Sequence, residues 1–82
     1  MKKKLTEMAY KENAFIASIE KDIMHKVSGM GVRVGKRVEM ITKQPLKGPL
    51  TISIEGTHTS LGRGVAEKIV VSPVRSPAFD KT

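Results

Sequence analysis

Alternation of apolar and polar residues is clearest in two segments near the middle of the chain. Residues 50–55 alternate strictly, which predicts a strand with one buried and one solvent-facing side. In an earlier segment, Val38, Met40 and Thr42 share one face. The other face carries Arg37, Glu39 and Ile41. The stretch Gln44–Pro49 between them contains Pro and Gly, which favour turns. The pattern therefore predicts two strands joined by a tight turn.

The remaining apolar positions predict shorter elements on either side of this pair. Leu5 and Met8 suggest a short turn that covers one end of the core. Ile23, Val27 and Met30 follow helical spacing and are expected to face inward. The other expected elements are a strand over 13–19 with a bend or bulge near Ser18, a helix over 23–28 capped by Asp22, a tight turn over 55–57, a strand over 58–61, a helical turn over 65–68 and a strand over 69–71.

Short strands, tight turns and a single short helix indicate an all-β fold with one short helix. We predict a small barrel of about five strands, because a closed sheet removes exposed edges in a chain too small for two layers. The barrel domain is expected over residues 1–72, and two Ser-Pro steps indicate a flexible C-terminal tail over 73–82. The predicted core consists of Ile16, Ile19, Val38, Met40, Leu50, Ile52, Ile54, Leu61, Ala66, Ile69 and Val71.

Composition narrows the classes of function. The 82 residues are enough for one small domain, and the absence of Cys excludes disulfides, thiolate zinc sites and Cys nucleophiles. No apolar run reaches the roughly 18 to 20 residues of a transmembrane helix. The basic start Lys2–Lys4 lacks the apolar segment of a signal peptide. We therefore expect a soluble, cytoplasmic protein with no membrane insertion.

A net charge of +7 favours acidic partners, which include nucleic acid, anionic lipid and acidic protein surfaces. Several cations cluster around the second strand and its turn, and such a cluster could steer docking to an acidic protein surface or to the anionic inner leaflet. A solvated barrel rim is the alternative interpretation. The candidate partner-binding residues are Lys26, Arg33, Lys36, Arg37, Lys43 and Lys47.

Nucleic-acid binding is the main rival function. The positive charge would attract phosphates, and small barrels can bind single strands. Such binders usually carry aromatic side chains on which bases stack. Tyr10, Phe15 and Phe79 are scattered along this chain, which disfavours nucleic acid as the partner.

Catalytic and metal-binding motifs are weak. His25 lies near Asp22 on the expected helix, and His58 lies beyond the tight turn, so these three are weak candidates for binding Fe(II) or another divalent transition metal. A third converging ligand is not visible beside either His. Residues 31–37 contain Gly and Lys without the spacing of a phosphate-binding loop. With no paired nucleophile and base, the chain is expected to lack enzymatic activity.

The order of these pieces resembles the FeoA family, the small cytoplasmic proteins of bacterial ferrous iron transport. The resemblance runs from about Leu5 to Val71 and leaves out the tail. FeoA-like sequences usually have Pro-Gly where this chain has Tyr10 and Lys11, and usually have Pro where this chain has Val34. The matching pieces are Met30-Gly31-Val32, Gly35, Pro45-Leu46-Lys47-Gly48-Pro49, Gly56-Thr57, Ser60-Leu61, Ala66 and Ile69-Val70-Val71.

The resemblance implies an SH3-like barrel and an accessory role beside FeoB, the membrane GTPase that imports ferrous iron. FeoA-like domains also occur at the C-terminal end of iron- and manganese-dependent repressors. A stand-alone regulatory or nucleic-acid-binding barrel is therefore the alternative function. The family offers no agreed catalytic residues, and its reported transition-metal binding comes without a ligand set for these positions. The oligomeric state and the direction of any effect on the partner stay open.

Overall fold

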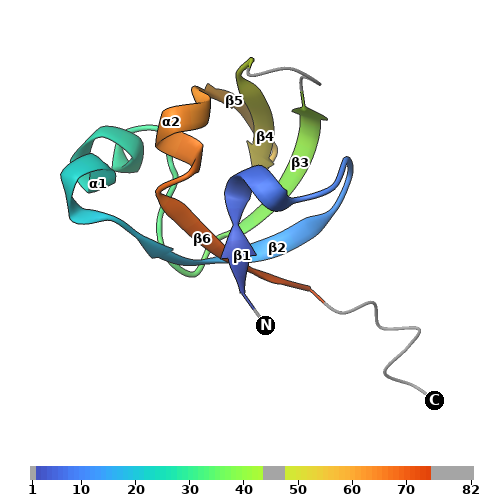
Figure 1. The fold of residues 1–82 in the computed structure, drawn as a ribbon, viewed down its shortest axis with the longest axis horizontal. Coiled ribbons are helices and arrows are strands. Elements are labelled where there is room, and N and C mark those ends of the chain that lie inside the picture. Colours follow the sequence, from blue (N-terminus) through green and yellow to red (C-terminus); the bar gives the residue numbers. More distant parts are fainter. Residues whose placement is uncertain (1, 44–47, 75–82) are drawn as a thin grey trace.

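A computed structural model describes residues 2–43 and 48–74, except for the side chain of Lys43. Its elements follow the order of the chain (Figure 1). They are β1 (Lys3–Lys4), the 3-10 helix η1 (Leu5–Glu7), β2 (Asn13–Ile19), α1 (Lys21–Ser28), β3 (Arg37–Lys43), β4 (Leu50–Ile54), β5 (Thr57–Leu61), α2 (Arg63–Ala66) and β6 (Ile69–Pro73).

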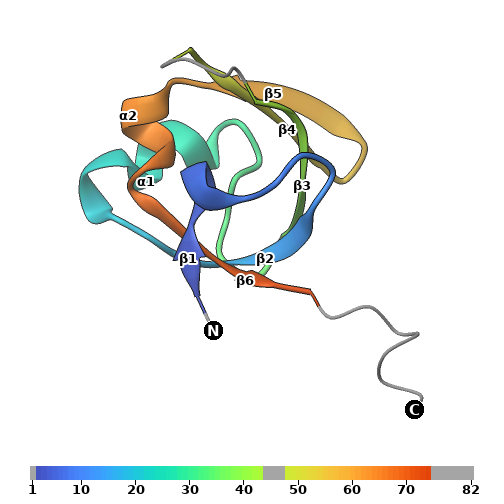
Figure 2. The same cartoon turned by 45° about the vertical axis from the view of Figure 1, so that its right-hand side comes forward.

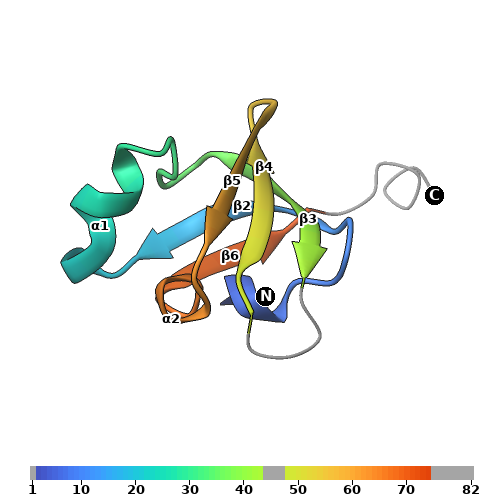
Figure 3. The same ribbon diagram turned by 90° about the horizontal axis from the view of Figure 1, so that it is seen from above.

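The strands form one antiparallel sheet in the order β1-β6-β2-β3-β4-β5. Figure 2 shows this sheet curled into a barrel, with η1 and α2 near one another. In Figure 3 the strands β4 and β5 cross over β2 and β6. The predicted all-β barrel with one short helix is confirmed. The prediction missed β1, because two terminal lysines carry no apolar alternation although they pair with Val70 and Val71.

The barrel interior contains every residue predicted to form the core. Burial of these aliphatic side chains is the main favourable contribution to folding. None of the fully buried side chains in the described ranges is polar or charged. The core also includes Leu5 and Met8, which were expected to cover one end of it, the inward-facing Ile23 and Val27 of the helix, and two residues that were not predicted, Ala14 and Val32.

Two strands contain irregularities in their pairing. The register of β2 with β6 shifts between Ile16 and Ser18, which confirms the predicted bulge. The register of β3 with β4 shifts between Met40 and Thr42. Because that shift interrupts the alternation, Thr42 is exposed while Val38 and Met40 are buried, so the prediction that these three residues share one face is wrong for Thr42.

Helix α1 begins two residues earlier than predicted, and Glu20 occupies the N-cap position in place of Asp22. The Glu20 N–H donates to the Lys68 carbonyl oxygen at 3.1 Å, which fixes the chain where it leaves β2. Ile23 and Val27 are buried as expected. Met30 was predicted to face inward and is 37% exposed, because the helix ends before it and the helical spacing no longer applies.

The later turns explain the remaining differences. Glu55 and Gly56 both have positive φ, 53° and 83°, as in the two-residue type I′ turn that matches strand twist. That turn lets β5 begin one residue earlier than predicted. The helix α2 also begins earlier, and β6 continues beyond the predicted residue 71. The predicted turn at 44–47 and the tail from residue 75 lie outside the described residues.

Candidate partner-binding surface

The segment between α1 and β3 is held by a series of main-chain hydrogen bonds. The N–H groups of Met30 and Val32 donate to the Val27 carbonyl oxygen at 2.9 and 3.1 Å. Gly31 has a φ of 86°, a conformation that glycine adopts at little cost. The chain thus reverses at the end of α1, and the buried Val32 anchors the segment to the core.

A tight turn over residues 33–36 follows this anchor. The Lys36 N–H donates to the Arg33 carbonyl oxygen at 3.2 Å, and Gly35 has a φ of 93°. The Gly35 N–H donates to the Ile16 carbonyl oxygen at 2.8 Å, and the Ile16 N–H donates to the Lys36 carbonyl oxygen at 2.9 Å. Since β2 holds the turn from both directions, the positions of Arg33 and Lys36 are defined by the barrel.

One carboxylate and one amide position two of the cations. The Lys36 Nζ lies 2.8 Å from Glu55 Oε2, and this hydrogen bond with its positive charge lowers the pKa of Glu55 below its usual value. The charge of Arg33 lowers the pKa of Glu55 further. The Arg37 Nε donates to Asn13 Oδ1 at 3.3 Å. Lys36 therefore points toward the β4–β5 turn, and Arg37 points toward β2.

The 33–36 turn borders two hollows of different chemistry. One, of about 460 Å³, is lined by polar and charged residues, which are Asn13, Lys36, Arg37, Glu39, Ser53 and Glu55, together with two glycines, and we call it the polar hollow. The other, of about 200 Å³, is mainly apolar and is lined by Ile19, Met24, Ser28, Val32, Arg33 and Val34. The turn therefore presents cations to both. We refer to the polar hollow with Arg33 as the basic edge.

The structure brings together only part of the predicted basic cluster. Arg33, Lys36 and Arg37 meet at the basic edge. Lys26 is exposed on α1 and lines neither hollow. The Lys43 side chain and Lys47 lie outside the described part of the chain.

The weak metal candidates do not converge. Asp22 is hydrogen-bonded to the Lys68 ammonium, and this bond lowers the pKa of the Asp22 carboxyl while raising the pKa of Lys68. His25 is exposed on α1, and His58 is exposed on β5. Figure 1 shows these two elements on different sides of the barrel. Within residues 2–43 and 48–74 there is no group of three or more His, Cys, Asp or Glu side chains that could hold a metal ion.

Sequence reasoning missed the other residues around the basic edge. Asn13, Ser53 and Glu55 come from three strands or turns, and only the sheet register brings them together. Val34 is 56% exposed, because it occupies the second position of the 33–36 turn. The following Gly35 was the available signal for that exposure, since glycine after the second turn residue is typical of a type II turn.

Comparison with known proteins identifies the family. A sequence model of the FeoA domain matches residues 3–73 of this chain. The chain belongs to the FeoA domain family. A crystal structure of an iron uptake regulatory protein, FeoA, superposes with a TM-score of 0.83 at 25% identity, over 90% of this chain and all of the other. The chain therefore has the SH3-like barrel fold of FeoA proteins.

A protein of Methanocaldococcus jannaschii named as an Fe(2+) transport protein A is 38% identical over 48 residues. That alignment covers 58% of this chain and 56% of the relative, so it spans little more than half of either protein. A manganese-dependent transcriptional repressor superposes with a TM-score of 0.82 at 16% identity, over 89% of this chain and 42% of the repressor. At that identity the repressor shares the fold alone.

Proposed function

We propose that this protein is a non-enzymatic accessory of ferrous iron transport that binds a FeoB-like membrane GTPase. The observation that carries the proposal is the match to the FeoA domain over residues 3–73. The names of the M. jannaschii relative and of the superposed FeoA protein, which refer to Fe(2+) transport and to iron uptake regulation, support the same process.

The chemistry of the basic edge supports action by contact. Its cations are positioned by hydrogen bonds and by the barrel, and the Glu55 carboxylate beside them is paired with Lys36. A surface of this kind can recognise an acidic patch and steer its approach. A domain that acts in this way changes its partner only by binding two states of that partner unequally.

The proposed contact surface is the basic edge together with the exposed side of α1. Arg33 is the cation best placed for contact, because it is exposed, lines the apolar hollow and has a charge that lowers the pKa of Glu55 in the neighbouring polar hollow. Lys36 and Arg37 already bind Glu55 and Asn13, so they contribute shape and charge with less freedom to rearrange. An acidic patch on the cytoplasmic GTPase domain is the complementary partner.

The test combines uptake with capture. We expect deletion of the gene to reduce ferrous iron uptake, and the wild-type chain to restore it. The immobilised chain should retain the membrane GTPase from detergent extracts at low and moderate salt. Normal uptake in the deletion strain, together with no retention of the GTPase at either salt, would overturn the proposal.

The alternative function, a regulatory or nucleic-acid-binding barrel, makes a different prediction. Its affinity for nucleic acid would fall steeply with salt, because phosphate contacts release counterions. Among the described residues, the aromatic side chains are those of Tyr10 in a turn and Phe15 in β2. Two aromatic side chains from separate elements do not form the row of rings on which successive bases stack. Titration of the chain with single- and double-stranded DNA separates the two functions.

A further inference from the structure

Exposed apolar side chains occur on α1 and on residues 29–34 that follow it, and we refer to these two segments together as the α1 end. Met24 is 41%, Met30 37% and Val34 56% exposed. They come from the helix, from the reversal after it and from the 33–36 turn, and the apolar hollow of about 200 Å³ opens between Met24 and Val34. Figures 1 and 3 place α1 at one extremity of the barrel.

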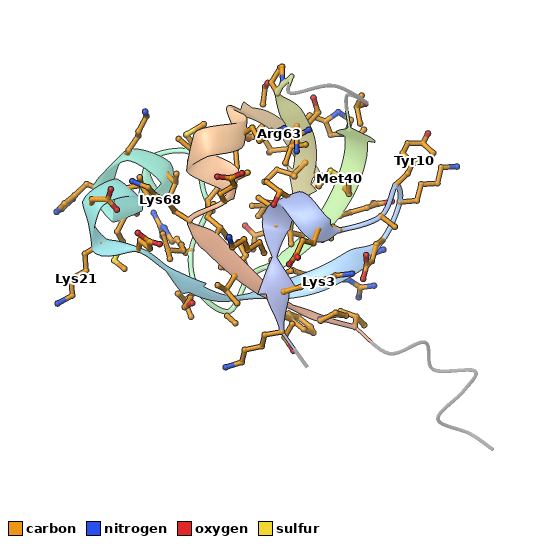
Figure 4. All side chains as sticks on the ribbon, in the orientation of Figure 1. Lys3, Tyr10, Lys21, Met40, Arg63 and Lys68 are labelled. Carbon is orange, nitrogen blue, oxygen red and sulfur yellow. The ribbon has the colours of Figure 1, made fainter. Side chains whose placement is uncertain are left out.

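Cations surround this apolar group. Lys21 and Lys26 are exposed on α1, and Arg33 lines the apolar hollow. Figure 4 shows Lys21 pointing away from the barrel. The acidic residues on and beside the helix are Glu20 and Asp22, and Asp22 is paired with Lys68. The α1 end therefore carries an excess of positive charge next to its apolar side chains.

We propose that the α1 end docks on an anionic phospholipid surface. Met24, Met30 and Val34 enter the boundary between headgroups and acyl chains, and the cations contact lipid phosphates. Apolar insertion and a basic patch are the two signals that peripheral membrane proteins combine, and each alone binds weakly. The three apolar side chains come from separate segments. A fluid lipid surface can adapt to all three, whereas a single rigid side chain of a protein partner cannot.

This contact is peripheral and reversible. No helix within the described ranges is long and apolar enough to cross a membrane. The inference goes beyond the proposed function and does not depend on it, because lipid alone is the ligand. Arg33 and the exposed side of α1 belong to both proposed contact surfaces, so lipid and the GTPase would compete for them.

Co-sedimentation with vesicles tests the inference on the intact protein. We expect binding to vesicles of equal parts phosphatidylglycerol and phosphatidylcholine, and little binding to pure phosphatidylcholine. High salt should weaken the binding, since exposed charges are screened. Equal binding to the two compositions, or no binding to either at low salt, would overturn the proposal.

Matched variants locate the contact. Met24→Ser should weaken vesicle binding, while Tyr10→Ser should not, although Tyr10 is 64% exposed. Lys21→Glu should weaken binding at least about fivefold, because each basic residue near an anionic surface contributes at about that level. Lys11→Glu changes the same charge outside the α1 end and should have a smaller effect. Circular dichroism verifies that each variant is folded.

Two results would assign the apolar hollow to another occupant. Unchanged vesicle binding by Met24→Ser, with loss of GTPase capture, would assign the hollow to the protein partner and overturn the lipid proposal. A dimer in sedimentation equilibrium without lipid that Met24→Ser dissociates would assign the hollow to a second copy, and would overturn it as well.

Discussion

The turns at 9–12 and 33–36 have the same geometry and different sequences. In the first, the Glu12 N–H donates to the Ala9 carbonyl oxygen at 3.0 Å, and in the second, the Lys36 N–H donates to the Arg33 carbonyl oxygen at 3.2 Å. The third residue of each turn has positive φ, 65° at one turn and 93° at the other. That combination indicates a type II turn, which favours Pro at its second position and Gly at its third.

The FeoA-like pattern places Pro-Gly at these positions, and this chain departs from it to different degrees. The 33–36 turn keeps Gly35 and has Val34 at the Pro position, whereas the 9–12 turn has Tyr10 and Lys11. The barrel enforces the second case, because the Lys11 N–H donates to the Met40 carbonyl oxygen at 2.7 Å. The 33–36 turn is specified locally by Gly35. The 9–12 turn is imposed by the surrounding barrel on Lys11, although a lysine disfavours positive φ.

The largest expected effect is loss of the glycine from the 33–36 turn. Gly35→Ala should lower the free energy of unfolding by about 1 to 2 kcal/mol, because a Cβ disfavours left-handed backbone. No atom lies within 4 Å of the added Cβ, so the cost is backbone strain alone. Gly64→Ala is the control, since Gly64 also has open space and lies in α2 without positive φ. Urea denaturation giving equal stabilities for the two variants would contradict the assignment.

The next effect has the opposite sign. Lys11→Gly should raise the free energy of unfolding by about 0.5 to 1 kcal/mol, because relief of the left-handed strain exceeds the added entropy of the unfolded chain. Lys11→Ala should stay within about 0.5 kcal/mol of the wild type, because it keeps the Cβ. A gain of stability in both variants would show that the lysine side chain, not its backbone, was unfavourable. Thermal and urea unfolding measure the difference.

A smaller gain is expected from restoring proline to the 33–36 turn. Val34→Pro should raise the free energy of unfolding by about 0.5 kcal/mol, because proline restricts the unfolded chain. Among the backbone hydrogen bonds of the described turns, none is donated by the Val34 N–H, so none is lost. Val32→Pro should destabilise the protein, since the Val32 N–H donates to Val27 and the side chain is buried. A destabilised Val34→Pro protein would argue against the type II assignment.

The smallest expected effect is electrostatic. Because Lys36 lowers the pKa of Glu55, the ion pair adds stability above the usual carboxyl pKa of 4.5, and this stability is lost as the pH falls through the lower folded-state pKa. Glu55→Gln should therefore reduce stability slightly at pH 7 and leave it unchanged in acid. Urea unfolding across this pH range measures the effect, and an equal loss at both ends would exclude the ion pair as its source.

The sequence predicted what depends on local pattern. Alternation and aliphatic content identified the barrel and its core, including Ile52 and Ile54 on β4. The sequence could not place Lys3 and Lys4 in a strand, because they form a strand only through their pairing with β6. It also missed the α1 end, since Met30 was read as core.

The candidate site was predictable only in part for the same reason. Arg33, Lys36 and Arg37 are close in sequence, so the cluster was visible without a structure. Their partners Asn13 and Glu55 lie on segments far away along the chain, and the sheet register brings them together. A local pattern cannot report such contacts.

The two turns also provide the most direct test of the central claim that this chain binds a FeoB-like membrane GTPase through its basic edge. Arg33→Glu and Lys11→Glu make the same charge change, one at each turn. Binding of the purified chain to the cytoplasmic domain of the GTPase should be weakened about tenfold by Arg33→Glu, with a reduced dependence on salt. It should be nearly unchanged by Lys11→Glu. Equal affinities for the wild type and both variants, or no measurable binding of the wild type at low salt, would contradict the account.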